Sequence, residues 1–155
     1  MEEEMSDLKV YMLGKFSMVY GDQPVIFKRN SATKVLKLLQ ILLHYSGVRG
    51  GISRNQLLEE LYGREEVSDA ANNLRVTVHR LKKMLADTIL PDYEYIQIDN
   101  GIYRWKSPMD TWVDVIDFSE NVKAGEAETN EAERYRHFKK ACLLYRGEFL
   151  PELSG

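Results

Sequence analysis

The chain has 155 residues, of which 44% are hydrophobic and 29% charged, proportions typical of a soluble globular protein. Its single cysteine, Cys142, excludes an internal disulfide framework and a cysteine-based zinc site, and it fits a reducing cytoplasm. The longest apolar run, 35–43, is interrupted by Lys37 and Gln40 and is too short to cross a bilayer. We therefore expect a cytoplasmic protein without membrane association.

The formal net charge of −3 is unevenly distributed along the chain. Residues 1–27 carry 2 basic and 5 acidic side chains, residues 28–106 carry 13 and 9, and residues 107–155 carry 6 and 10. A basic middle segment between two acidic segments indicates an anionic partner for the middle segment only. The acidic residues 1–7 lack the basic start of a secretory signal, and we expect them to form a flexible leader.

The N-terminal half predicts a small sheet followed by helices. Two β-type runs lie within 8–20, and a third run at 25–27 completes an expected antiparallel sheet. A helix is predicted from Ser31 to Gly47, and it is apolar over most of its circumference, as expected of a central core helix.

Two further helices follow in close succession. The first is predicted over 52–62, where Ser53 and Gln56 have the spacing of a capping box. The second is predicted over 68–87, with Ser68 as its N-cap. The short charged connection 63–67 makes the pair a helix-turn-helix.

The helix predicted over 68–87 has two chemically different faces. On a wheel of about 100° per residue, the aliphatic side chains Ala70, Leu74, Val78, Leu81 and Leu85 cluster on one side. The other side carries amide, imidazole, guanidinium and ammonium groups with one small apolar residue, Val76. Such groups can contact base edges and phosphates in a major groove. An ordinary solvent-exposed helix face is the alternative explanation of the same pattern.

Asn100-Gly101, between alternating β-formers, predicts a hairpin with a two-residue type I′ turn. This turn pairs Ile98 with Tyr103 and Ile96 with Trp105 on a face expected to pack on the helices. It pairs Gln97 with Arg104 and Asp99 with Ile102 on an exposed face. A sheet, three helices and a terminal hairpin, in this order, predict an α+β fold of the winged helix-turn-helix type.

The sequence changes character after Pro108. A helix is expected within 111–123, where Asp114 and Asp117 have capping-box spacing, and Thr129 is predicted to cap a second helix. The second helix has a regular apolar stripe of Ala132, Tyr135, Phe138, Cys142 and Tyr145. Two such helices predict the start of a helical repeat, similar to a tetratricopeptide array, in a fragment of a longer protein.

The stretches LGKF, SRNQLLEELYG, DAANNLRVTVHRLKKML and GIYRW resemble the OmpR-type winged helix. DAANNLRVTVHRLKK resembles the corresponding stretch of the Streptomyces antibiotic regulatory proteins, and VDVIDF with KKACLLYRGEFLPEL is similar to the start of their bacterial transcriptional activator domain. The resemblance covers about residues 8–153. It implies a DNA-binding domain over 8–107 and the N-terminal part of an activator domain over 108–155.

The resemblance also implies a function and a set of contact residues. In that family the long helix enters the major groove of double-stranded DNA, and the hairpin reaches a minor groove or phosphates. By position, Arg75, Val76 and Arg80 would face bases. Asn72, Thr77, His79, Lys82 and Lys83 would contact phosphate or the groove edge, and Gln97 and Arg104 are the hairpin candidates. Asp99 departs from the family, since many relatives have a basic residue near the hairpin tip.

The resulting hypothesis is a bacterial transcription regulator, an activator by resemblance, that binds DNA as a homodimer or tandem pair, with RNA polymerase as a further expected partner. No catalytic residues, metal ligands or cofactor are expected, because the sequence has no phosphate-binding Gly-rich loop, HExxH, CxxC or nucleophile–base pair. The alternative hypothesis is a protein–protein interaction module that has the winged helix and helical repeat without DNA binding. The acidic flanks and Asp99 favour that alternative.

Overall fold

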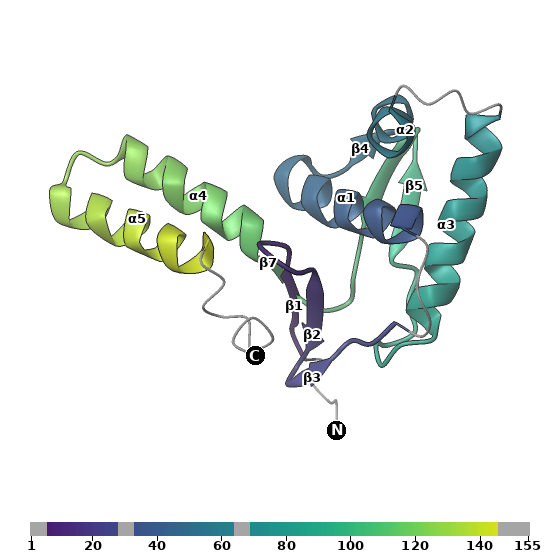
Figure 1. Ribbon diagram of the computed structural model, residues 1–155, viewed down its shortest axis with the longest axis horizontal. Helices are drawn as coiled ribbons and strands as arrows, with labels where there is room; N and C mark the ends of the chain where they lie inside the picture. The colour runs from purple at the N-terminus through teal and green to yellow at the C-terminus, as the bar shows by residue number, and fades with distance from the viewer. Residues whose placement is uncertain (1–5, 28–32, 64–68, 146–155) are drawn as a thin grey trace. The chain divides into compact units, whose positions relative to one another are not determined.

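The computed structural model describes residues 6–27, 33–63 and 69–145. The chain divides into two compact units, one formed by residues 25–109 and the other by Ser6–Pro24 together with the chain from Asp110 onward. Figure 1 labels most of the helices and strands of both. The predicted mixed α+β class and the winged helix followed by helices are confirmed. The leader predicted over 1–7 and the N-cap predicted at Ser31 fall wholly or mostly outside the described residues.

The first unit contains three helices and a three-stranded sheet. The helices are α1 (Thr33–Arg49), α2 (Arg54–Tyr62) and α3 (Ala70–Ala86), and the strands are β4 (Ile52–Ser53), β5 (Ile96–Asp99) and β6 (Ile102–Trp105). Helix α1 is the core helix that its sequence predicts, since it contacts α2, α3, β4 and β6. Its side chains at Val35, Leu38, Leu39, Ile41, Leu42 and Leu43 are all buried.

Polar contacts join α1 to α2. The ammonium group of Lys34 donates a hydrogen bond to the carbonyl of Leu61, near the end of α2. The hydroxyl of Tyr45 donates to Oε1 of Glu60 at 2.8 Å, and this hydrogen bond is the main cause of the raised pKa of Tyr45. Ser53 caps α2 as predicted, and its hydroxyl accepts the amide of Gln56 at 3.3 Å. The bonds of Lys34 and Tyr45 hold the first helix of the helix-turn-helix against the core helix.

The wing hairpin, β5 and β6, has the predicted register, with Ile96 opposite Trp105 and Ile98 opposite Tyr103. Asn100 and Gly101 have φ values of 51° and 75°, as a type I′ turn requires. The predicted packing of the hairpin face is wrong at its tip, because Ile96 is buried whereas Ile98 is 51% exposed. Ile52, predicted to begin a helix, instead lies in β4, which pairs with β6.

The second unit contains a four-stranded sheet and two helices. Its strands, in the spatial order β3-β2-β1-β7, are β3 (Gln23–Pro24), β2 (Ser17–Tyr20), β1 (Leu8–Tyr11) and β7 (Thr111–Val113). The expected antiparallel pairing of three N-terminal strands is present, but the third strand precedes the predicted run at 25–27. Strand β7 adds a parallel neighbour to β1. This pairing places the N-terminal strands in one compact unit with residues after 110, although the sequence-based boundaries of 8–107 and 108–155 separate them.

Helix α4 (Asp114–Ala127) begins directly after β7. The capping box predicted from Asp114 and Asp117 is wrong, because Asp114 is the first helical residue and Val113 occupies the cap without a side-chain bond. The buried carboxylate of Asp114 instead accepts the amides of Met12 at 2.7 Å, Leu13 at 3.0 Å and Val115 at 2.7 Å. Asp114 thus joins the loop after β1 to the start of α4.

Helix α5 (Glu131–Tyr145) packs against α4. Oδ1 of Asn130 accepts hydrogen bonds from the backbone amides of Ala132 and Glu133 at the start of α5. The predicted cap at Thr129 is therefore wrong by one residue. The predicted apolar stripe is also wrong, since Tyr135 and Tyr145 are 65% and 69% exposed while Ala141 and Leu144 are buried. Among the described residues, none of the helices has the length and apolar character needed to cross a membrane.

Candidate nucleic-acid interface

Helix α3 is the second helix of the helix-turn-helix, and its start differs by one residue from the prediction. Its N-cap is Asp69, which has a left-handed backbone with φ 81° and ψ 53° and whose side chain accepts the amide of Asn72 at 3.3 Å. The residue predicted as the cap, Ser68, lies outside the described residues. Aspartate is among the few residues that adopt this backbone conformation readily while also satisfying a helix N-terminus.

The buried face of α3 fixes the helix on the first unit. Leu74, Thr77, Val78, Leu81 and Leu85 are buried on this face, and Ala70, predicted on the same side, is half-buried. Thr77, a predicted DNA contact, lies on this buried face and not on the exposed one. Its hydroxyl donates to the carbonyl of Asn73 at 2.7 Å and lies 3.4 Å from the hydroxyl of Tyr62. Only 8% of Thr77 is exposed, because its place in the helical period is on the core side.

The opposite face of α3 is exposed and basic. Helix α3 contains the basic residues Arg75, Arg80, Lys82 and Lys83 and no acidic residue. All the other predicted helix contacts lie on this exposed face, namely Asn72, Arg75, Val76, His79, Arg80, Lys82 and Lys83. Val76 is 38% exposed, so a small apolar side chain lies among the polar groups. Guanidinium groups can pair with guanine, a valine can contact a thymine methyl, and lysines can bind phosphate.

A groove of about 530 Å³ separates α3 from the wing hairpin. Helix α3 contributes Arg75, His79 and Lys82 to this groove, and the hairpin contributes Ile98 and Tyr103. Arg54, at the start of α2, also lines it, and the amide of Arg54 donates to the carbonyl of Gly101 at 3.0 Å. Sequence reasoning missed Arg54, although its position directly after the cap Ser53 places it at a helix N-terminus.

The two predicted hairpin contacts do not line this groove. Gln97 is half-buried, and its amide nitrogen donates to the carbonyl of Glu94 at 3.3 Å. Arg104, opposite Gln97 in the hairpin, is half-buried, and its Nε is buried without a hydrogen-bond partner within the described part of the chain. The structure therefore brings the α3 residues together and leaves Gln97 and Arg104 on the other face of the hairpin.

Acidic side chains border the basic face. Asp99 at the hairpin tip is exposed, and among the described residues it forms no ion pair. Glu94, just before β5, lies with its Oε2 3.7 Å from Nζ of Lys82. The electrostatic surface around α3 is therefore basic along the helix and acidic at the edge of the hairpin.

Comparisons with known proteins agree with this geometry. Residues 29–102, which contain the three helices and most of the hairpin, match the family described as transcriptional regulatory protein, C terminal. Among solved structures, the chain is similar to Mycobacterium tuberculosis EmbR in complex with a low-affinity phosphopeptide, with a TM-score of 0.60 and 21% identity over 93% of this chain. The chain spans 37% of the length of that protein, and none of the curated protein sequences compared matches it. The family match supports the winged helix of a transcriptional regulatory protein over residues 29–102, and the likeness to the solved structure shows a shared fold.

Proposed function

We propose that this chain is a sequence-specific DNA-binding transcription regulator that places α3 in the major groove. The observation that carries the proposal is the exposed face of α3, which has four basic residues and no acidic residue in a winged helix-turn-helix. Arg75, Val76 and Arg80 contact base edges, and Asn72, His79, Lys82 and Lys83 contact phosphates or the groove edge. Arg54 joins the phosphate contacts, because it lines the same groove as Arg75 and Lys82.

The finer assignment is an activator of the Streptomyces antibiotic regulatory type. The fold likeness over 93% of the chain supports this assignment, since it extends past the winged helix into α4 and α5. In this proposal residues 108–155 are the N-terminal part of the activator domain, and the protein occupies DNA as a homodimer or tandem pair. RNA polymerase is the partner expected of an activator.

The proposal is tested by the salt dependence of affinity for duplex DNA, measured by fluorescence anisotropy. Each phosphate contact contributes about 0.9 to the slope of log affinity against log salt concentration. Replacing the phosphate contact in Lys83→Gln should lower the slope by about 0.9. The matched control Lys37→Gln removes an exposed lysine of α1 and should leave the slope unchanged. Equal effects of the two variants, or no binding at low salt, would contradict the proposal.

The second candidate function is protein binding by a winged helix that does not bind DNA. The exposed carboxylates of Asp99 and Glu94 beside α3 favour it, since they repel a phosphate backbone. Under this alternative, the chain does not bind duplex DNA at low salt. Arg80→Ala then leaves the affinity for a protein partner unchanged.

A further inference from the structure

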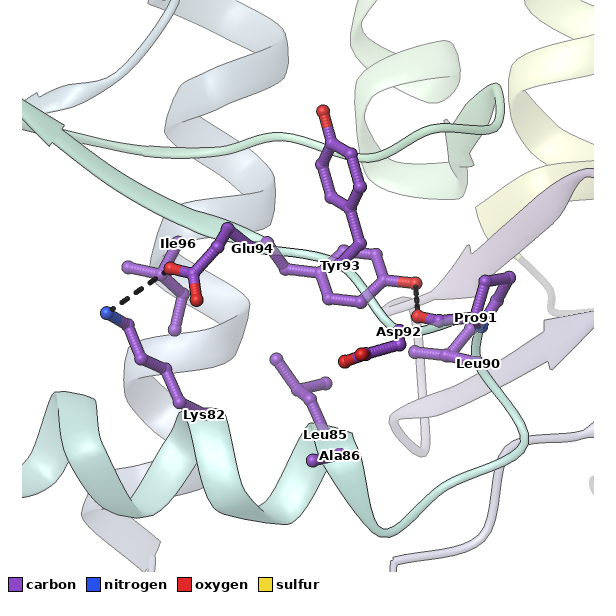
Figure 2. Close-up of a pocket in the computed structure, with 10 residues that line it drawn as sticks. Lys82, Leu85, Ala86, Leu90, Pro91, Asp92, Tyr93, Glu94 and Ile96 are labelled. Atoms are coloured by element: carbon purple, nitrogen blue, oxygen red, sulfur yellow. Dashed lines mark hydrogen bonds and ion pairs between the residues drawn. The ribbon is translucent and has the colours of Figure 1, made fainter.

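Lys82 occupies a particular position on the basic face, at the boundary between two hollows. It lines the groove between α3 and the hairpin, and it also lines a separate cavity of about 210 Å³ beneath the C-terminal end of α3. Leu85 and Ile96 form part of the apolar wall of this cavity (Figure 2). In Figure 2 the Lys82 side chain extends toward the carboxylate of Glu94, and Nζ and Oε2 lie 3.7 Å apart.

The backbone around Glu94 is held in place by its neighbours. The hydroxyl of Tyr95 donates to the carbonyl of Pro91 at 2.6 Å, and its ring stacks on Trp105 with centroids 4.8 Å apart. The carbonyl of Tyr95 accepts the amide of Lys106 at 2.7 Å. The carbonyl of Glu94 accepts the side-chain amide of Gln97 at 3.3 Å. Glu94 is therefore fixed at its Cα while its carboxylate remains within reach of Lys82.

This ion pair contributes little to folding, because both side chains are solvated, with 42% of the Lys82 side chain and 79% of the Glu94 side chain exposed. Its effect on an incoming polyanion is larger. The ammonium group already has an anionic partner, so a phosphate must displace that partner before it gains the contact.

We propose that Glu94 is a positioning residue that competes with DNA phosphate for Lys82 and so limits the affinity of the α3 face for duplex DNA of any sequence. This inference rests on the proposed DNA-binding function, and it identifies a residue that limits the DNA affinity of the same site. Glu94 sets affinity and salt dependence through Lys82. Sequence preference, which comes from the base-contacting residues Arg75, Val76 and Arg80, is independent of it.

The test is a double-mutant cycle of Glu94→Gln and Lys82→Gln, with affinity for a random-sequence duplex measured by anisotropy at several salt concentrations. Glu94→Gln should raise the affinity about three- to tenfold at low salt and steepen the log–log salt slope by up to about 0.9, the value of one phosphate contact. In the Lys82→Gln background, the same substitution should change neither quantity. Glu59→Gln is the matched control, since it removes an exposed carboxylate of α2 and should have no effect in either background.

The outcomes separate this inference from the function on which it rests. A gain from Glu94→Gln that persists in the Lys82→Gln background overturns the inference, because Glu94 then acts by general repulsion. The absence of any gain also overturns it, and in both cases the DNA-binding function stands, since the unaltered chain binds the duplex. If the unaltered chain does not bind the duplex at low salt, the proposed function fails and the inference fails with it. Far-UV circular dichroism of the five variants establishes that each is folded.

Discussion

Val76 and Thr77 are adjacent in α3 but have opposite surroundings. Val76 is 38% exposed among basic side chains, whereas Thr77 is 8% exposed and hydrogen-bonded within the first unit. A rotation of about 100° per residue separates them, and Thr77 lies near the boundary between the two faces. A sequence wheel therefore separates most exposed residues of α3 from its buried ones but does not decide residues at the edge of the stripe.

We predict that Thr77→Val lowers the free energy of unfolding by about 1 kcal/mol, because it removes the hydroxyl that donates to Asn73 and contacts Tyr62. The affinity for duplex DNA should stay unchanged, since the side chain is buried. Urea denaturation measures the first quantity and anisotropy the second. If a folded Thr77→Val protein lost affinity for duplex DNA, the Thr77 side chain would contribute to the DNA interface.

Asp114 shows how a residue can fill a role that its local sequence does not indicate. Its spacing from Asp117 predicts a capping box, but its carboxylate accepts amides of Met12 and Leu13, about a hundred residues earlier. Local sequence holds no information on such distant partners. The buried carboxylate also accepts a hydrogen bond from the amide of Val115, so both of its oxygens are hydrogen-bonded.

We predict that Asp114→Ala lowers the free energy of unfolding by about 2–4 kcal/mol, since it leaves buried amides without an acceptor. Glu126→Ala, at an exposed position of the same helix, should change the free energy of unfolding by less than about 0.5 kcal/mol. Urea denaturation of the two variants checks the difference. Equal effects would show that the Asp114 bonds do not stabilise the second unit.

At the scale of elements, the wing hairpin is the part best predicted from sequence. Asn100-Gly101 determines a two-residue turn, and the turn determines the register, so every predicted pair is present. The depth of packing could not be predicted, because it depends on which parts of the first unit lie against the hairpin. Ile96 is buried, whereas Ile98 is 51% exposed.

Alanine substitutions at two glycines, Gly101 in the hairpin turn and Gly51 beside β6, should destabilise the protein by different amounts. Gly101 has a φ of +75° with no atom near an added Cβ, so Gly101→Ala should cost about 1 kcal/mol from backbone strain alone. Gly51 has a φ of +144°, and an added Cβ would lie 2.6 Å from Ile102 and 2.9 Å from the Tyr103 carbonyl oxygen. Gly51→Ala should therefore destabilise the protein clearly more than Gly101→Ala. Equal losses in urea denaturation would contradict the close packing of Gly51 on β6.

The shortest elements and the C-terminal helix were predicted least well. Strands of two or three residues, such as β4 and β7, are too short to show an alternating pattern. In α5 the apolar residues are distributed around the helix, so their spacing does not indicate which of them are buried, and the buried ones are Ala141 and Leu144. Phe138 of α5 lies close to Gly125 of α4, where an added Cβ would lie 2.7 Å from the ring.

At the scale of the whole molecule, the division into compact units depends on a pairing between distant strands. Strand β1 pairs in parallel with β7 across about a hundred residues, and no local pattern indicates this partner. The helix-turn-helix and wing, in contrast, are formed by consecutive segments, so their order in the sequence predicts the fold of the first unit. The candidate interface could be predicted for the same reason, since most of its residues belong to a single helix.

The uneven charge of the chain agrees with this division. The basic middle segment, 28–106, contains α3 and the groove, although the whole chain has a formal net charge of −3. Affinity for DNA should therefore come from the first unit, and acidic segments on both sides should reduce non-specific binding.

The central claim is that the exposed face of α3 reads DNA sequence, and binding-site selection from a random duplex pool tests it most directly. Selection is carried out at low and moderate salt with the unaltered chain, with Arg80→Ala, and with Arg136→Ala, which removes an exposed arginine of α5, as the control. We predict a repeated motif for the unaltered chain and the control, and its loss in Arg80→Ala, because a guanidinium–guanine pair is worth about 1–3 kcal/mol of discrimination. An unchanged motif in Arg80→Ala, or no enriched motif for the unaltered chain, would contradict the claim.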